Sequence, residues 1–322
     1  MTSRTAIIGA GLSCVRELRR AGHYVDIFEA NSSIGGRVST MRVGVVPYDH
    51  GAQYITGHSS IFRGFITELV EPVYAARWKP GQSAEQGNRA AAIADWFVGI
   101  PVMSSILRPL AQGVRIHTSR VVHTLSKAQQ GWRIWFDDRT SAEPFSAVAI
   151  CVPAPQAQLL LGPLDEIASQ LSRVRMSPSW SLMVRLDERV LPEKDIYFDL
   201  SELIRWVARN NAKPGRTARG ETVVVHASPS WSREGEDADP EIVAEEILGE
   251  VSHILSLPPI RPTQMTAHLW RYGLVEEALG ESYVYSSEDR VGVAGDWCLG
   301  RIAEHVFESG EGLGHAINSS LD

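Results

Sequence analysis

The chain has 322 residues, of which 44% are hydrophobic and 21% are charged, and its formal net charge is -7. This composition is typical of a folded globular protein and excludes the disordered, collagenous and coiled-coil classes. The length favours two domains, or one large α/β domain with a sizeable insertion. Because the charge is negative and no Lys/Arg-rich run occurs, we expect the partners to be small molecules or proteins, and we expect no binding to nucleic acid or to a membrane.

The sequence also indicates a compartment and the state of its cysteines. No apolar run approaches the roughly 20 residues of a membrane-spanning helix. The first apolar run is short and is soon followed by the charged residues 16–20, so we expect no signal peptide and a cytoplasmic protein. The cysteines, Cys14, Cys151 and Cys298, form no C-x-x-C pair, which favours buried, reduced thiols over a disulfide framework or a metal site.

The N-terminal residues predict a βαβ unit. Residues 5–8 read as a short strand, a helix follows to about Ala21, and Gly22 ends that helix. Residues 24–28 read as a second strand that ends on Glu29. Parallel strands joined by a helical crossover begin a doubly wound sheet, which is the fold expected for this part of the chain.

The middle of the chain predicts an antiparallel meander, a return to the main sheet and then a second domain. The predicted strands are residues 114–125, 132–136, 147–152, 181–186, 223–228, 265–270 and 291–294. The predicted helices are residues 156–161, 165–173, 240–257 and 306–321. In the helix at 240–257 the apolar residues expected to face inward are Ile242, Ile247, Val251, Ile254 and Leu255. Residues 210–220 read as a loop.

The turn after the first strand carries the clearest local signal for function. Gly9 permits a tight bend, Gly11 permits close approach to a pyrophosphate, and Glu29 follows at the spacing expected of a residue that binds ribose hydroxyls. Cys14 stands where a third glycine is usual. Taken alone, this pattern leaves an ordinary turn between strand and helix as an alternative.

Further motifs resemble the two-dinucleotide-binding flavoproteins of the amine-oxidase type. Gly35-Gly36-Arg37 follows the acidic residue, and its arginine is suited to bidentate pairing with phosphate. Residues 49–54, Asp-His-Gly-Ala-Gln-Tyr, are similar to the family's loop beside the flavin ring. Gly295-Asp296 and Glu308-Ser309-Gly310 are similar to its last motif. In that motif the acid holds the ribityl chain and a helix N-terminus faces the pyrimidine end of the flavin.

Other segments resemble the bacterial renalases in particular, namely residues 51–56, 153–156, 206–216, 224–232 and 268–272. This resemblance implies a noncovalent FAD enzyme that oxidises the 2- or 6-dihydro isomers of NAD(P) to NAD(P)⁺. A hydride would pass to flavin N5 and then O2 would be reduced to hydrogen peroxide. The substrate and O2 are therefore the expected partners. No residue stands out as a general base, which favours this substrate over an amine.

The resemblance also implies site residues. Those expected to bind FAD are Gly9, Gly11, Leu12, Glu29, Ala30, Gly36, Arg37, Gly51, Ala52, Gln53, Tyr54, Val122, Gly295, Asp296 and Ile302. Those expected to line the substrate pocket are Gln53, Tyr54, His226, Trp270 and Arg271. Lys213 and Arg216 lie in a segment of solvent-exposed type, where a charged surface loop is at least as good an interpretation.

The expected fold is therefore α/β, amine-oxidase-like, with a discontinuous Rossmann-type FAD domain and an inserted α+β substrate domain. The FAD domain is expected at residues 1–62, 99–158 and 286–322, and the substrate domain at 63–98 and 159–285. The first crossover is about three residues shorter than is usual, nearly one helical turn, which would weaken FAD retention if it disturbed the packing. Two alternatives stay open: an amine oxidase of the same fold, and a dinucleotide-binding sensor without activity.

Overall fold

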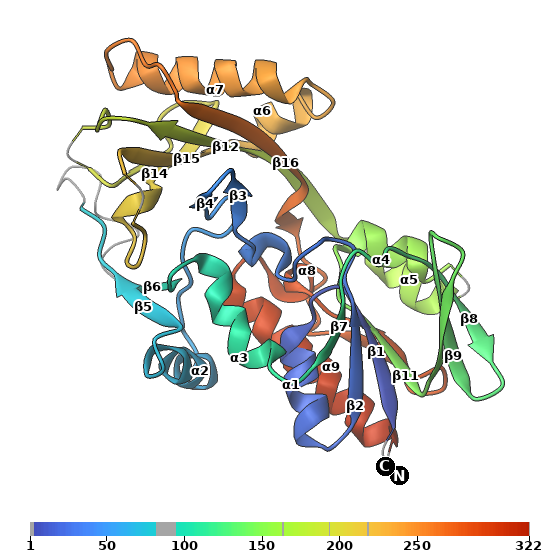
Figure 1. The fold of residues 1–322 in the computed structure, drawn as a ribbon. Coiled ribbons are helices and arrows are strands. Elements are labelled where there is room, and N and C mark those ends of the chain that lie inside the picture. Colours follow the sequence, from blue (N-terminus) through green and yellow to red (C-terminus); the bar gives the residue numbers. More distant parts are fainter. Residues whose placement is uncertain (1–2, 82–94, 163, 193, 218, 322) are drawn as a thin grey trace. The chain divides into compact units, whose positions relative to one another are not determined.

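The predicted first strand lies inside a six-stranded sheet of the computed structural model (Figure 1). The structure describes residues 3–81, 95–162, 164–192, 194–217 and 219–321. The chain divides into two compact units. Unit 1 comprises residues 1–36, 107–176 and 275–322, and unit 2 comprises residues 37–106 and 177–274. Their boundaries differ from the predicted ones at residues 37–62 and 99–106, which belong to unit 2, and at residues 159–176 and 275–285, which belong to unit 1. Residues 82–94 of the predicted substrate domain lie outside the described residues.

Unit 1 is built on the doubly wound sheet. In order across the sheet its strands are β17 (Val284–Ser286), β18 (Val291–Val293), β11 (Ala147–Ile150), β1 (Arg4–Ile8), β2 (Tyr24–Phe28) and β7 (Arg115–His117). All neighbours are parallel except β17 and β18. Every residue of β11 is buried, as expected of a parallel strand that is covered on both faces.

The predicted strand at residues 114–125 is wrong as a single element. It is two strands, because β7 joins the parallel sheet whereas β8 (Val122–Ala128) belongs to a separate three-stranded sheet. Ser119 has a φ of 54° between them, a conformation that a continuous strand does not allow. The three-stranded sheet has the order β10 (Ser141–Phe145), β9 (Gly131–Phe136), β8, of which β10 was not predicted. Two helices, α4 (Ala154–Leu160) and α5 (Asp165–Leu171), follow β11 as predicted.

The short first crossover helix is intact. Helix α1 (Leu12–Arg20) ends before Gly22, and β1 and β2 pair in register from Arg4 with Tyr24 to Ile8 with Phe28. Nine helical residues are therefore enough to connect these strands. Helix α1 packs along α9 (Ala303–Leu321) (Figure 1), and the short helices α3 (Arg108–Ala111) and α8 (Asp296–Leu299) contact α1 and α9 respectively.

Unit 2 is built on an antiparallel five-stranded sheet. Its order is β13 (Ile196–Phe198), β14 (Ile204–Arg209), β15 (Glu221–Ala227), β12 (Arg175–Leu186) and β16 (Gln264–Glu277). Two hairpins accompany it, β3 (Met41–Val43) with β4 (Val46–Tyr48), and β5 (Ala75–Trp78) with β6 (Trp96–Gly99). The helices of this unit are α2 (Ser60–Val70), α6 (Pro229–Glu234) and α7 (Pro240–Ile254), and 3-10 turns occur at Gly36–Val38, Met103–Leu107 and Asn210–Ala212.

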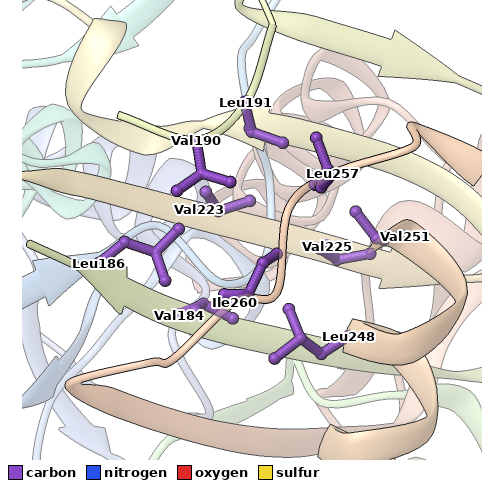
Figure 2. Close-up of a pocket in the computed structure, with 10 residues that line it drawn as sticks. All are labelled: Val184, Leu186, Val190, Leu191, Val223, Val225, Leu248, Val251, Leu257 and Ile260. Carbon is purple, nitrogen blue, oxygen red and sulfur yellow. The ribbon is translucent and has the colours of Figure 1, made fainter. Parts of the chain in front are cut away.

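Helix α7 covers one face of the five-stranded sheet, and the β3–β4 hairpin lies on the opposite face (Figure 1). The buried residues of α7 are Val243, Ala244, Ile247 and Val251. The predicted inward position of Ile242 is wrong, since its side chain is 56% exposed. The cavity beneath α7 is only about 10 Å³ in volume and is lined entirely by aliphatic side chains (Figure 2). It has no polar group to bind a ligand, so the candidate site lies elsewhere.

Candidate active site

The dinucleotide turn of unit 1 is formed by β1, α1 and the end of β11. Gly9 has a φ of 84°, and a Cβ added there would lie 2.5 Å from the carbonyl oxygen of Cys151, so only glycine fits. Its amide donates to Phe28 O (2.9 Å), which brings the turn beside the end of β2. Gly11 is the N-cap of α1 and has no side chain to cap the helix. The first amides of α1 therefore stay available for an anion.

Glu29 lies at the end of β2 as predicted, with its side chain 5% exposed. Its Oε1 accepts hydrogen bonds from the backbone amide and the Nδ2 of Asn31 (2.9 and 2.8 Å). Its backbone is held by His117 O and Arg120 N. A carboxylate fixed in this way next to the glycine turn fits the ribose hydroxyls of a dinucleotide.

The missing third glycine is compensated by glycines on α9. Cys14 is fully buried in α1. A Cβ added at Gly310 would lie 2.0 Å from Ser13 Oγ and 3.1 Å from Cys14 N, and one at Gly314 would lie 3.1 Å from Cys14 O. The close approach of the two helices thus depends on the small residues of α9, and a thiol at position 14 is accommodated.

The predicted C-terminal motif lies at the end of β18. Gly295 N donates to Ser309 Oγ (2.9 Å), which joins the two parts of the motif. Asp296 begins α8, is 5% exposed, and accepts from Trp297 N (2.9 Å). Because Glu308-Ser309-Gly310 lies inside α9 and not at its start, the helix begins earlier than predicted. Since β1, β2 and β18 run parallel, these groups share the carboxyl edge of the sheet.

The other residues predicted to contact FAD from unit 1 lie at exposed or half-buried positions, except for Leu12. They are Leu12 at the start of α1, Ala30 after Glu29, Gly36, Val122 at the start of β8, and Ile302 before α9. The glycine turn, the free first turn of α1 and the fixed acid together fit an FAD molecule. The individual contacts of these residues with FAD stay predictions.

In unit 2, the predicted loop beside the flavin is joined to Arg37. Ala52 N donates to Arg37 O (2.7 Å), and a Cβ at Gly51 would lie 2.1 Å from that same oxygen. Gly51 is therefore required for the close approach of the two segments. Arg37 Nη1 lies 3.4 Å from Gly273 O. Its role toward phosphate stays a prediction.

The charged residues behind this loop form a buried network that the sequence did not indicate. Lys213 is fully buried and Arg216 nearly so, which corrects their interpretation as surface residues. Both pair with the carboxylate of Asp49, Lys213 Nζ at 3.3 Å and Arg216 at shorter range. Asp49 Oδ1 also accepts from Met103 N (2.9 Å) and Thr40 Oγ1 (3.1 Å). Burial raises the pKa of Asp49, but the two cations outweigh it and hold that pKa below its usual value.

This network determines how the amide of Gln53 is oriented. Lys213 Nζ donates to Gln53 Oε1 (2.9 Å), and an ammonium group can only donate. The Nε2 of Gln53 therefore faces the carbonyl oxygens of Asp49 and Gly51. Burial lowers the pKa of Lys213 to about 8, while the charge of Asp49 opposes that shift. Lys213 is thus mainly protonated at neutral pH and holds Gln53 in place.

Two predicted pocket residues meet at the carbonyl oxygen of His50. Trp270 Nε1 and His226 Nε2 each lie 3.1 Å from it. The ring of His50 packs against Trp270 (4.6 Å between centroids) and His268 (5.0 Å). Burial lowers the pKa of His50 to about 3 and that of His226 to about 4, and it also lowers the pKa of His268. All three imidazoles are therefore neutral at physiological pH.

Tyr54 belongs to an aromatic cluster. Its ring stacks on Trp96 at 3.9 Å with an interplanar angle of 2°, and it lies 5.8 Å from Trp206. The remaining members are Trp78 and Phe198. Burial raises the pKa of Tyr54, so its phenol stays protonated.

Arg271 lies apart from the other predicted pocket residues. It forms ion pairs with Glu236 (2.5 Å) and Asp237 (3.5 Å), and its side chain is 53% exposed. Adjacent residues of a strand point to opposite faces, so Arg271 and Trp270 cannot serve the same surface.

Comparison with known proteins agrees with this geometry. The family described as flavin containing amine oxidoreductase matches residues 10–70 and 93–311. The chain belongs to this family. Its cofactor is FAD, and it is an FAD-dependent oxidoreductase with oxidase activity. The predicted amine-oxidase-like α/β fold and the resemblance to renalase are confirmed.

Individual relatives show how far the similarity extends. Mouse renalase is 23% identical over 312 residues, covering 87% of each chain. An L-amino-acid oxidase of Siganus canaliculatus is 44% identical over 73 residues, only 21% of this chain and 14% of that protein. The structure of cyclohexylamine oxidase from Brevibacterium oxydans IH-35A covers all of both chains with a TM-score of 0.74 and 13% identity, which shows a shared fold.

Two further properties concern the described residues alone. None of their helices combines the length and the apolar character needed to cross a bilayer. Nor do His, Cys, Asp and Glu side chains within these ranges gather into a group that would hold a metal ion.

Proposed function

We propose that this oxidoreductase converts the 2- or 6-dihydro isomers of NAD(P) to NAD(P)⁺ and uses O2 as the electron acceptor. The proposal is supported by the similarity to mouse renalase over 87% of both chains. It is also supported by the renalase-like segments, which supply Gln53, His226 and Trp270 to one connected cluster in unit 2.

The observation that carries the proposal is the environment of the titratable groups in this cluster, where His50 is buried and Asp49 is both buried and ion-paired. An amine is protonated at neutral pH and must lose a proton before it can lose a hydride. Imidazoles whose pKa values lie at about 3 for His50 and about 4 for His226 are poorly matched to that proton transfer. The carboxylate of Asp49 is already ion-paired with Lys213 and Arg216, so it is not free to accept that proton. A dihydropyridine requires no base, because loss of a hydride makes it an aromatic pyridinium directly.

The overall reaction balances without a protein-derived oxidant. One dihydronicotinamide, one O2 and one proton give one pyridinium and one hydrogen peroxide. FAD, when bound, supplies the two-electron acceptor that O2 reoxidises. The chain's own residues bind and orient: Lys213 holds Gln53, and His226 and Trp270 are anchored on His50 O. Such orientation matters because a misplacement of about 1 Å can cost roughly a hundredfold in rate.

Rapid anaerobic mixing of the oxidised enzyme with 2-, 4- and 6-dihydronicotinamide dinucleotides tests the proposal. We expect fast loss of flavin absorbance with a 2- or 6-dihydro isomer and slow loss with NADH, the 4-dihydro form. Fast reduction by a primary or secondary amine, with none by any dihydronicotinamide, would refute the proposal. That result would establish the amine oxidase, the alternative that the structural similarity to cyclohexylamine oxidase favours.

The second alternative, a dinucleotide sensor without activity, is less favoured by the family membership. It predicts a protein that is not bleached by any reductant in this experiment, although its melting temperature rises with added dinucleotide.

A further inference from the structure

His226 has one ring nitrogen whose role is determined by its neighbours. Its Nε2 lies 3.1 Å from His50 O, and a carbonyl oxygen can only accept a hydrogen bond. The amide nitrogen of Gln53, 3.4 Å from the same Nε2, can only donate, since Lys213 fixes the orientation of that amide. The shorter contact therefore places the proton on Nε2, donated to His50 O. The neutral ring then has its unprotonated lone pair on Nδ1.

The Nδ1 atom is open to a ligand. Within the part of the chain that the structure describes, no side chain or backbone group hydrogen-bonds to it. The side chain of His226 is half-buried, and Nδ1 is not among the fully buried polar atoms that lack a partner. Across the sheet, His226 pairs with Trp206 of β14 on one side and Ser181 of β12 on the other. The imidazole of His226 therefore has the indole of Trp206 and the small side chain of Ser181 as its cross-strand neighbours.

The charges around His226 select the kind of donor that it can bind. Lys213 and Arg205 are the cations whose charges act on the ring, in addition to burial, and both disfavour its protonated form. Asp49, the acid of the buried network, is already paired with Lys213 and Arg216. A protonated amine would be repelled by the same two cations that add to the effect of burial in disfavouring protonated His226. A neutral N–H donor carries no such penalty.

We propose that His226 Nδ1 accepts a hydrogen bond from the carboxamide N–H of the nicotinamide ring and thereby discriminates carboxamide-bearing substrates from analogues that lack this donor. A carboxamide is a neutral donor on a planar ring, which matches an uncharged acceptor flanked by Trp206. This inference rests on the proposed function, because it assigns a residue to its substrate. It makes His226 a specificity-determining, substrate-binding residue.

Calorimetric titration of the FAD-loaded enzyme tests this inference without relying on turnover. The ligands are NAD⁺ and its 3-acetylpyridine analogue, in which a methyl group replaces the amide nitrogen. We expect the wild-type enzyme to bind NAD⁺ about five- to tenfold more tightly, the worth of one neutral hydrogen bond. Equal affinities for the two ligands in the wild type would overturn the inference, and this comparison needs no variant.

Two variants of His226 distinguish the roles of its two ring nitrogens. His226→Gln places an amide nitrogen where Nε2 was and loses the acceptor at Nδ1. This variant should therefore bind NAD⁺ and the 3-acetylpyridine analogue with about equal affinity. His226→Asn places Oδ1 where Nδ1 was, so its preference should persist. The exposed His253→Asn is the control and should keep the wild-type preference. A Gln variant that is folded, flavin-loaded and still selective would refute the assignment.

The result is distinguishable from failure of the proposed function. If 2- or 6-dihydro isomers reduce the flavin rapidly but carboxamide and acetyl ligands bind alike, only the role of His226 is wrong. If no dihydronicotinamide reduces the flavin and neither oxidised dinucleotide binds, the proposed function fails and the inference fails with it.

Discussion

Lys213 is a buried cation whose charge is balanced by an acid far away in the sequence. Its side chain is 0% exposed and its partner Asp49 is 1% exposed. Removing one member of a buried ion pair leaves the other charge in a poorly solvated place, and such losses cost about 3–5 kcal/mol. Arg216 also contacts Asp49 and would moderate the loss.

We therefore expect Lys213→Met to lower the free energy of unfolding in urea by about 3 kcal/mol. The double variant Asp49→Asn/Lys213→Met should lose less stability than the sum of its single variants, because the Asp49–Lys213 pair is then lost only once, although Arg216 is left without its carboxylate partner. Lys127→Met removes a lysine that is 58% exposed and should cost less than about 1 kcal/mol. A double variant that is less stable than the sum of its single variants would contradict this account of the pair.

Because the pKa of His50 is lowered in the folded protein, we expect the free energy of unfolding to depend on pH in the acidic range. Its pKa in the folded protein is about 3, chiefly because of burial, whereas an unfolded histidine has a pKa of about 6.5. Between these values the unfolded chain binds the additional proton, so the free energy of unfolding falls as the pH falls through this window. Urea unfolding at several pH values from 4.5 to 6.5 measures this slope.

In His50→Phe that slope should be smaller by up to about 1.4 kcal/mol per pH unit, the value for one proton. His253→Phe controls for the loss of an exposed imidazole. An unchanged slope in His50→Phe would show that His50 is not held neutral in the folded state.

At the scale of elements, the contact of α1 with α9 explains how a dinucleotide motif tolerates Cys14. Close helix packing is provided by Gly310 and Gly314 of α9, and not by a glycine in α1. The same kind of substitution should then have opposite effects in two helices, depending on what surrounds the glycine.

Gly310→Ala would place a methyl group 2.0 Å from Ser13 Oγ and 3.1 Å from the backbone of Cys14, so the helices must separate. We expect a loss of about 1–3 kcal/mol in the free energy of unfolding. Gly249→Ala in α7 has no atom within 4 Å of the new methyl group and should stabilise the protein by about 0.5–1 kcal/mol. Thermal unfolding of both variants checks the pair; a stabilising Gly310→Ala would contradict the packing argument.

At the scale of the whole molecule, the cofactor is FAD, and the expectation that it is bound noncovalently has a direct test. Acid precipitation should release all of the flavin into the supernatant as FAD. Glu29→Ala should purify with less flavin. Its free energy of FAD binding should be weaker by about 1–3 kcal/mol, because the ribose hydroxyls would be left without their acceptor. Full flavin content in that variant, or flavin that stays with the precipitate, would refute the corresponding expectation.

Local signals in the sequence were enough for the dinucleotide half of the site. The spacing of Gly9, Gly11 and Glu29 reflects short-range geometry, since a tight turn, a helix start and a strand end follow one another within the βαβ unit. The strands around them were predicted for the same reason, because apolar periodicity is local. The error at residues 114–125 arose where two strands of different sheets follow each other closely.

Burial of charge is the opposite case, because it depends on contacts between residues that are distant in the sequence. Lys213 reads as a surface residue within a segment rich in Asn, Pro and Gly, and nothing nearby reveals its partner Asp49, 164 positions earlier. The separation of Arg271 from Trp270 likewise depends on which face of β16 is exposed. The sequence alone determined the family, the cofactor motif and many of the strands, but not β3 to β6, β10, β13, β14 or β17. Only the tertiary structure decided which histidines are neutral, which cations are buried and which end of Gln53 faces Lys213, since burial and pairing are properties of the folded chain.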